Sequence, residues 1–292
     1  MTTGFLLIIA AGFCWIGVGI SVSICSARSW NYNIVQGLNY LGAALICALI
    51  LAGSSASGAS WEAPGWGVIA SCVAGIANFY SYVFTSKAMQ RGPNGLVWGI
   101  MQAGMIGSFL MGVICFGEQA APLRLLGLVL ILCGVLAMGL GKGSNWIVPS
   151  LIAFLLVMAT HCCNALPSYF PDTAKTGVLF RTMGIYSGGV LGFALTTLPG
   201  MIRTRDFGGR GERITAGILM VLNISASVFF YLGLDRLANA GCGGLGYPVG
   251  IGVCIIGFSL YSMLILKEKF ARLSLAGLIS VGIGIIMISI RR

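Results

Sequence analysis

The sequence predicts an all-α integral membrane protein of ten transmembrane helices, built from two inverted repeats of five helices each. Composition is the first reason: 58% of the 292 residues are apolar and only 8% are charged, whereas a soluble domain carries about 25% charged residues. The second reason is that apolar runs of about 20 residues, the length a helix needs to cross a bilayer, recur along the chain. The third is an internal repeat at a spacing of 150 residues.

The first repeat, residues 1–142, contains five expected spans. Each is a long apolar run without the alternation of apolar and polar residues that marks a membrane-spanning strand. We therefore expect helices at residues 4–26, 33–53, 64–87, 94–116 and 122–141.

The second repeat, residues 143–292, contains the other five spans. Glycine is frequent throughout, with 44 in the chain, because membrane helices use small residues to pack closely. Gly184, Gly188 and Gly192 form one such packing ridge. The expected helices are residues 146–166, 177–200, 212–234, 240–265 and 271–290.

The repeat rests on nine identical pairs of residues that match without a gap. In each half an apolar segment ends at a glutamate, a short polar turn follows, and a second Gly-rich segment closes the half. An odd number of spans per half inverts the second half in the membrane, a frequent building plan of secondary transporters. The first members are Ala88, Gly107, Leu110, Glu118, Leu123, Leu125, Gly127, Leu128 and Gly134, and the second members lie 150 residues later.

These two junctions, Glu118 to Leu128 and Glu268 to Leu278, together with ten spans, resemble the drug/metabolite transporter superfamily and its EamA-like ten-helix fold. The resemblance covers nearly the whole chain and implies a secondary transporter. Three shorter matches are similar to the rhamnose–proton symporter and sugar-uptake branch. They are Arg28-Ser29-Trp30, Gly75-Ile76-Ala77-Asn78 and Leu266-Lys267-Glu268.

The basic residues predict an orientation. Eleven lie in the loops that follow odd-numbered spans, and six lie in the other loops and at the C-terminus. Because basic residues are enriched in cytoplasmic loops, we expect both termini on the outer side of the cell (inner) membrane, although Arg291 and Arg292 oppose this bias. The net charge of +10 thus comes from basic residues in loops beside the lipid bilayer, and no nucleic-acid partner is expected.

Polar residues in the middle of spans are the candidate substrate-binding residues, because such groups are costly unless they line a cavity or pair with one another. Amide and aromatic groups suit a small neutral or zwitterionic solute such as a sugar. The alternatives are hydrogen bonds between helices and, for the aromatic residues, anchoring at the membrane interface. The candidates are Asn78, Tyr82, Trp98, Gln102, His161, Asn164, Asn223, Tyr231 and Tyr247.

His161 is the only histidine of the chain. An ordinary histidine pKa of about 6.5 would allow it to couple transport to protons near neutral pH, whereas a neutral histidine bonded between helices is the alternative. No carboxylate that could carry a coupling proton is evident in mid-span. The alternatives for coupling are H⁺, Na⁺ and facilitated transport without a coupling ion.

Other charged residues are expected near the ends of spans. We interpret Arg181 as an arginine whose head group reaches the interface, and contact with an anionic substrate is the alternative. Glu118 and Glu268 are interpreted as capping or salt-bridging residues, and Asp172 and Asp235 as loop residues.

Gly92 and Pro93 in the first half, and Gly246 and Pro248 in the second, mark expected hinges. Proline and dense glycine weaken a helix, and unwound helix ends line the sites of many transporters. Close packing against a neighbouring helix is the alternative interpretation of the glycines.

Three classes of function remain. The first is a secondary transporter of a small polar metabolite by alternating access, with an exporter of amino acids or other metabolites on the same fold as its variant. A membrane-embedded enzyme and a structural membrane subunit are the others. We expect no enzyme activity, because one histidine and no mid-span carboxylate are a poor catalytic set. We also expect no cofactor or metal: there is no nucleotide-binding P-loop motif, and the ten cysteines lack the paired spacing of a zinc site.

Overall fold

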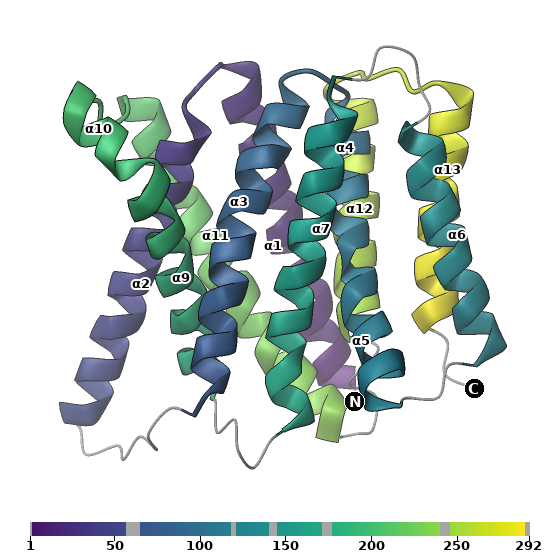
Figure 1. The fold of residues 1–292 in the computed structure, drawn as a ribbon, viewed down its shortest axis with the longest axis horizontal. Coiled ribbons are helices and arrows are strands. Elements are labelled where there is room, and N and C mark those ends of the chain that lie inside the picture. The colour runs from purple at the N-terminus through teal and green to yellow at the C-terminus, as the bar shows by residue number, and fades with distance from the viewer. Residues whose placement is uncertain are drawn as a thin grey trace.

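The computed structural model describes residues 2–56, 65–117, 121–139, 145–170, 177–239 and 246–289, and within these ranges all regular structure is helical. The helices run along a common direction and pack in a bundle, with α3 and α7 in front of α1 and α11 in the view of Figure 1. The first half contains α1 (Thr2–Ala27), α2 (Tyr32–Ala56), α3 (Gly67–Met89), α4 (Asn94–Gln102), η1 (Ala103–Met105), α5 (Ile106–Phe116) and α6 (Pro122–Gly139). The second half contains α7 (Ile147–Ala165), η2 (Leu166–Tyr169), α9 (Val178–Thr196), α10 (Leu198–Thr204), α11 (Arg210–Asn239), α12 (Gly246–Leu264) and α13 (Arg272–Ser289).

Eight helical segments are long and apolar enough to cross a membrane: α1, α2, α3, the continuous segment from α4 to α5, α7, α9, α11 and α12. The apolar parts of α6 and α13, Pro122–Met138 and Arg272–Ile288, are shorter. The outer faces carry large apolar side chains that are largely exposed, such as Leu49, Ile114 and Leu195. An exposed apolar surface of this extent marks contact with lipid, so the chain has the character of a multi-pass membrane protein.

The ten expected segments all coincide with helices, but three of them differ in detail. The fourth is interrupted by the 3₁₀ turn η1, and the seventh ends at Thr196, with α10 as a separate short helix. The eighth continues to Asn239, so Asp235 is a helical residue and not the loop residue expected. Residues 240–245, expected to begin the ninth span, lie outside the described residues.

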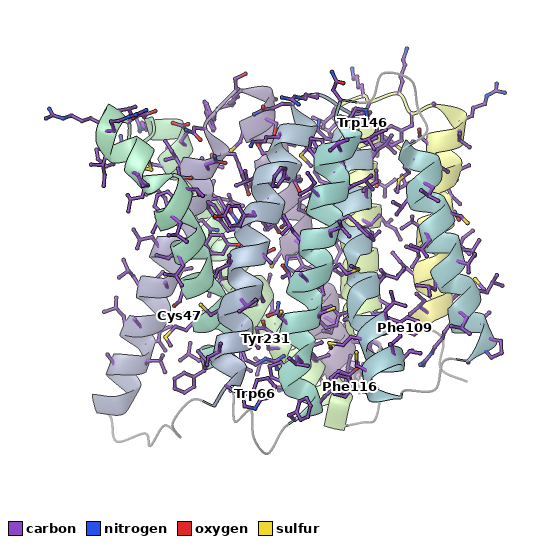
Figure 2. The ribbon with its side chains drawn as sticks, in the orientation of Figure 1. Cys47, Trp66, Phe109, Phe116, Trp146 and Tyr231 are labelled. Atoms are coloured by element: carbon purple, nitrogen blue, oxygen red, sulfur yellow. The ribbon has the colours of Figure 1, made fainter. Side chains whose placement is uncertain are left out.

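The two ends of the bundle differ in charge. One end, called here the basic end, holds the exposed residues Arg28, Lys87, Arg91, Arg205 and Lys267. The start of α1 and the end of α13 both lie at the opposite end, called here the terminal end (Figure 1). Aromatic rings lie near both ends: Trp146 near the basic end, and Trp66 and Phe116 near the terminal end (Figure 2). Such rings favour the membrane–water interface.

Helices of the two halves are interleaved. α1 packs against α11 and α12, and α3 packs against α7 and α9. α2 contacts α9 and α11, α4 contacts α12 and α7, and α6 pairs with α13. The expected glycine ridge on α9 is confirmed as a packing surface, because a Cβ on Gly184 would lie 2.8 Å from the Cβ of Ser71 on α3.

The crossing of α6 and α13 brings together four glycines that the repeat relates. A Cβ on Gly127 would lie 2.7 Å from the carbonyl oxygen of Gly284, and one on Gly134 would lie 2.6 Å from that of Gly277. Gly277 and Gly284 stand 150 residues after Gly127 and Gly134. The Ser280 hydroxyl donates to the Leu130 carbonyl, 2.9 Å away, between the two glycine contacts. The helices therefore approach backbone to backbone, which only glycine permits.

Candidate functional site

A cavity of about 80 Å³ lies inside the bundle. A buried water needs about 10–15 Å³ measured in the same way, so the cavity has room for several waters or a small solute. Its wall is built by eight helices, α1, α2, α3, α4, α7, α9, α11 and α12, which come from both halves. The lining residues are Trp15, Tyr40, Asn78, Tyr82, Met101, Gln102, Val157, Thr160, His161, Asn164, Ile185, Tyr186, Asn223, Ser227, Phe230, Tyr231, Tyr247 and Ile251.

Eight of the nine candidate binding residues lie in this wall, and Trp98 does not. Trp98 is fully buried behind it, and its indole N–H donates to the Cys254 sulfur at 3.2 Å. The Gln102 amide donates to the same sulfur at 3.4 Å. Cys254 thus serves as an acceptor, a role that the sequence did not suggest.

The candidate amides are paired across helices. The Asn78 amide on α3 donates to the Tyr40 hydroxyl on α2 at 2.9 Å. The Asn223 amide on α11 donates to the Asn39 oxygen on α2 at 3.4 Å. These bonds match the alternative interpretation, helix–helix hydrogen bonding, and the same side chains still face the cavity.

The two tyrosines on α9 and α11 are paired in the same way. The Tyr231 hydroxyl donates to the Asn164 side-chain oxygen on α7 at 3.4 Å. The Tyr186 hydroxyl lies 3.2 Å from the Ser227 hydroxyl. Tyr40, Tyr186 and Ser227 also belong to the wall. They are outside the nine candidates, although their polarity in mid-span is visible in the sequence.

His161 and Tyr247 are different, because their polar atoms have no hydrogen-bond partner among the described residues. Both ring nitrogens of His161 and the hydroxyl of Tyr247 are buried and unpaired. The two rings meet edge to face, with centroids 5.1 Å apart. An unsatisfied buried polar group costs about 1–3 kcal/mol. These atoms therefore mark the part of the wall best suited to meet a ligand or water.

An aromatic layer separates the cavity from the basic end. The rings of Tyr32 and Tyr82 lie 6.5 Å apart, those of Tyr82 and Trp98 lie 6.2 Å apart, and those of Trp98 and Phe258 lie 5.2 Å apart. All four residues are buried. The layer joins α2, α3, α4 and α12, so it connects both halves on the side of the cavity that faces the basic end.

At the basic end, Glu268 joins the start of α4 to the turn that follows α12. Its carboxylate accepts from the Asn94 backbone and side-chain N–H groups, both at 2.7 Å, and from the Gly95 N–H at 3.1 Å. The Ser262 hydroxyl also donates to it. Glu268 thus caps the N-terminus of α4 from the turn that follows α12, which confirms the capping interpretation. Its counterpart, Glu118, lies outside the described residues, as does Asp172.

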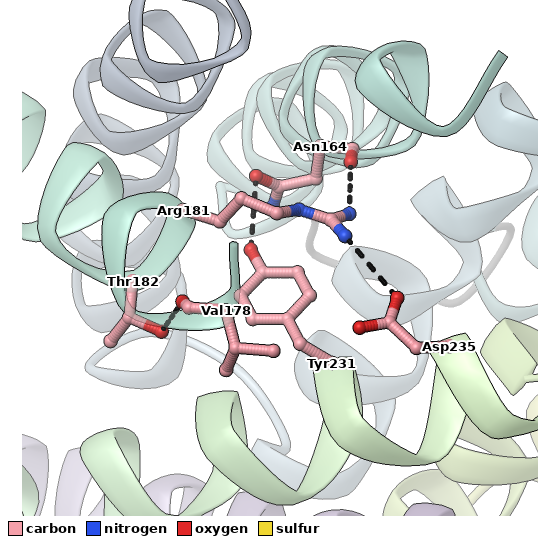
Figure 3. A network of polar contacts seen from close by, with 6 residues as sticks. All are labelled: Asn164, Val178, Arg181, Thr182, Tyr231 and Asp235. Carbon is pink, nitrogen blue, oxygen red and sulfur yellow. Dashed lines mark hydrogen bonds and ion pairs between the residues drawn. The ribbon is translucent and has the colours of Figure 1, made fainter. Parts of the chain in front are cut away.

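A polar network lies at the terminal end of the cavity (Figure 3). Arg181 is 4% exposed, so the interpretation of Arg181 as an arginine that reaches the interface is wrong. Its Nη2 donates to the Asn164 carbonyl at 2.9 Å, and its Nη1 lies 3.8 Å from the Asp235 carboxylate. Its guanidinium lies over the Tyr231 ring, 4.2 Å from the centroid. Nearby, the Thr182 hydroxyl donates to the Val178 carbonyl within α9 at 2.7 Å.

The expected hinge residues all lie at helix starts. Pro93 is the residue before α4, with an extended backbone, and Gly92 lies against the ring of Trp146. Gly246 and Pro248 fall in the first turn of α12. Proline in a first turn removes no internal hydrogen bond, so these prolines begin helices without breaking them. Movement at these positions stays a prediction.

No protein-family model and no curated protein matches the chain. Sixteen chains of solved structures do match. One of them, described only as the crystal structure of a protein, has a TM-score of 0.63 over 98% of this chain and 96% of that chain, at 14% identity. The fold is therefore shared with an experimentally determined structure over nearly its full length. An identity this low shows the fold alone.

Proposed function

We propose that the chain is a secondary transporter of the drug/metabolite transporter superfamily. It carries a small polar metabolite, a sugar or a similar neutral or zwitterionic solute, by alternating access. The observation that carries the proposal is the cavity: its wall contains many polar groups, is drawn from eight helices of both halves, and lies between an aromatic layer and the polar network around Arg181. A binding site between two halves is what alternating access requires.

We further propose ten spans in two inverted repeats, with α6 and α13 as the fifth and tenth. The helix contacts support a two-fold relation. Exchanging each helix with its counterpart in the other half turns the α1–α11 contact into the α7–α3 contact, and the α1–α12 contact into the α7–α4 contact. It likewise turns α2–α11 into α9–α3, and it leaves α2–α9, α4–α12 and α6–α13 unchanged. The four glycines of the α6–α13 crossing obey the same exchange.

The make-up of the wall favours transport over a membrane-embedded enzyme. Among the described residues that line the cavity there is one imidazole, and the other polar groups are amides, hydroxyls and the indole of Trp15. General acid–base or nucleophilic catalysis needs a base aligned with a nucleophile or reacting group, and His161 has no such partner among the described residues. Export and import use the same fold, so an exporter of amino acids or related metabolites is the alternative within this class.

Uptake of labelled sugars and amino acids into proteoliposomes tests the proposal. A thermal-shift screen of the purified chain identifies a solute that binds, and the binding of this solute is then measured in the variants. Losing one hydrogen bond to a neutral ligand costs about 0.5–1.5 kcal/mol. Asn78→Ala, Gln102→Ala and Tyr231→Phe should therefore weaken binding several-fold to about tenfold without preventing membrane insertion. Asn78→Ala also frees the Tyr40 hydroxyl, so its effect should be the largest.

Tyr32→Phe is the matched control for Tyr231→Phe. Tyr32 is also a buried tyrosine, 3% exposed, and its hydroxyl donates to Gln36 outside the cavity wall. Tyr32→Phe should leave the affinity for the solute unchanged. If the three cavity variants bind the solute like the parent chain, the binding site is elsewhere and these polar groups serve helix packing.

A further inference from the structure

We infer that Arg181 forms an anion subsite at the terminal end of the cavity, and that the transported solute carries a carboxylate. This inference rests on the proposed function and narrows the class of solute from neutral or zwitterionic metabolites to carboxylates such as sugar acids or amino acids.

The charge of Arg181 is incompletely balanced. An arginine presents five N–H donors, and among the described residues Arg181 makes one hydrogen bond, to the Asn164 carbonyl. Its Nε is buried without a partner in the described part of the chain. The Asp235 carboxylate, at 3.8 Å, is beyond hydrogen-bonding distance and its side chain is 53% exposed. A cation that is 4% exposed is stable only when paired and hydrogen-bonded, so the contacts with Asn164 and Asp235 leave the charge of Arg181 incompletely compensated.

The location joins this cation to the cavity. Arg181 is not in the wall itself, but it contacts two residues that are: the Asn164 carbonyl and the Tyr231 ring (Figure 3). Tyr247, whose hydroxyl is unpaired among the described residues, lies next to this pair through Phe230, whose ring centroid is 5.9 Å from that of Tyr231 and 4.7 Å from that of Tyr247. The unpaired Tyr247 hydroxyl thus belongs to the same aromatic group of the cavity wall as Tyr231, the ring that Arg181 contacts.

The chemistry selects a carboxylate among anions. A guanidinium binds a carboxylate through two parallel hydrogen bonds, and the free Nε supplies one donor of such a pair. Arg181 carries one positive charge and contacts the wall residues Asn164 and Tyr231, so it matches one negative charge. A phosphate dianion would bring a second charge that no described wall residue balances.

Binding would proceed as an exchange of partners. The solute carboxylate takes the place of Asp235 beside Arg181, so the buried cation stays paired throughout. The Asp235 side chain is already half exposed at the terminal end, so its release into water needs little further change. Because Asp235 lies on α11 and Arg181 on α9, the exchange also removes the ionic link between these two helices.

The alternative is a structural ion pair that only ties α9 to α11. The two interpretations predict opposite results for Asp235→Asn. Removing a competing carboxylate from an anion subsite strengthens the binding of an acid. Removing one partner of a structural pair strands a buried charge and weakens the folded state without favouring acids.

The test uses the purified full chain and two matched pairs of probes, D-galacturonate with D-galactose and L-serine with L-serinamide. Dissociation constants from thermal-shift titrations separate a sugar acid from an amino acid. In at least one pair the acid should bind more tightly than its neutral or amide counterpart. Arg181→Gln should weaken the acid tenfold or more, the effect expected of a charged hydrogen bond, and leave the counterpart unchanged. Asp235→Asn should strengthen the acid several-fold.

Arg236→Gln is the control, since Arg236 is an exposed neighbour on α11 and should change nothing. Arg181→Lys keeps the charge without the paired geometry, so it serves if Arg181→Gln does not fold, and it should reduce the preference for the acid. The inference is overturned if neither acid is preferred, if the preference survives at Arg181→Gln, or if Asp235→Asn weakens acid and counterpart alike. Binding of D-galactose that is lost in Tyr231→Phe, with no preference for acids, would overturn this inference and leave the proposed function standing.

Discussion

The crossing of α6 and α13 gives a sharp test of the fold, because its closest contacts are between backbones. In Gly134→Ala the new Cβ would lie 2.6 Å from the Gly277 carbonyl oxygen and 2.8 Å from a methyl carbon of Val281. Side-chain Cβ atoms do not approach other atoms this closely, and a backbone carbonyl has no rotamer with which to yield. The two helices must therefore move apart.

The size of the effect follows from two opposing terms. Alanine favours a helix over glycine by about 1 kcal/mol, and overpacking a tight contact costs about 1–3 kcal/mol. A Cβ on Gly282 of α13 would meet no described atom within 4 Å, so Gly282→Ala receives the first term alone. The difference in unfolding free energy between the two variants is then the overpacking term, about 1–3 kcal/mol, with Gly134→Ala the less stable.

Unfolding in mixed micelles with increasing dodecyl sulfate, followed by circular dichroism, measures this difference. Gly277→Ala should behave like Gly134→Ala, since its Cβ would lie 2.6 Å from the Gly134 carbonyl oxygen. If Gly134→Ala is as stable as Gly282→Ala, α6 and α13 do not cross at these glycines.

Two further predictions concern orientation and coupling. From the excess of basic residues in the odd-numbered loops, a C-terminal green fluorescent protein exported by the general secretory route should be dark and an alkaline phosphatase fusion active; the reverse pattern would place both termini in the cytoplasm. If His161 carries the coupling proton, His161→Gln should abolish accumulation driven by a pH gradient and leave counterflow exchange intact. Accumulation that survives would assign His161 to packing and favour Na⁺ as the coupling ion.

The helices can be predicted from the sequence because the hydropathy of a segment depends on whether lipid or water surrounds it. The expected fourth span, 94–116, matches the segment from α4 to α5 in both limits. Its internal 3₁₀ turn is not predictable, because it depends on close contact between Gly104 and α7, where a Cβ would lie 2.6 Å from the Phe154 carbonyl oxygen. The eighth expected span is too short because Asp235 and Arg236 are charged residues typical of a loop, whereas the helix continues through them.

The site is predictable where polarity alone marks it. Mid-span amides and aromatic residues are rare enough that eight of the nine candidates line one cavity. Trp98 is the exception, because nothing in the sequence shows that Cys254, on another helix, accepts its N–H. The prediction for Arg181 is wrong for a similar reason. It lies one turn inside its span, where an arginine can either reach water or turn inward, and tertiary contacts with Asn164 and Tyr231 decide between these.

The pairing within the cavity bears on how a transporter of this kind can empty its site. Asn78, Asn223 and Tyr231 each have a partner on another helix, so releasing a solute leaves them satisfied and costs little. His161 and Tyr247 have none among the described residues. A solute or water that binds to them therefore breaks no existing hydrogen bond with the protein, and the new hydrogen bond contributes its full free energy. On the proposed function, the paired groups shape the cavity and each add one hydrogen bond to the solute, and the unpaired groups supply the larger share of the difference in free energy between the loaded and empty states. Affinity should therefore depend more on His161 and Tyr247 than the number of polar residues in the wall would suggest.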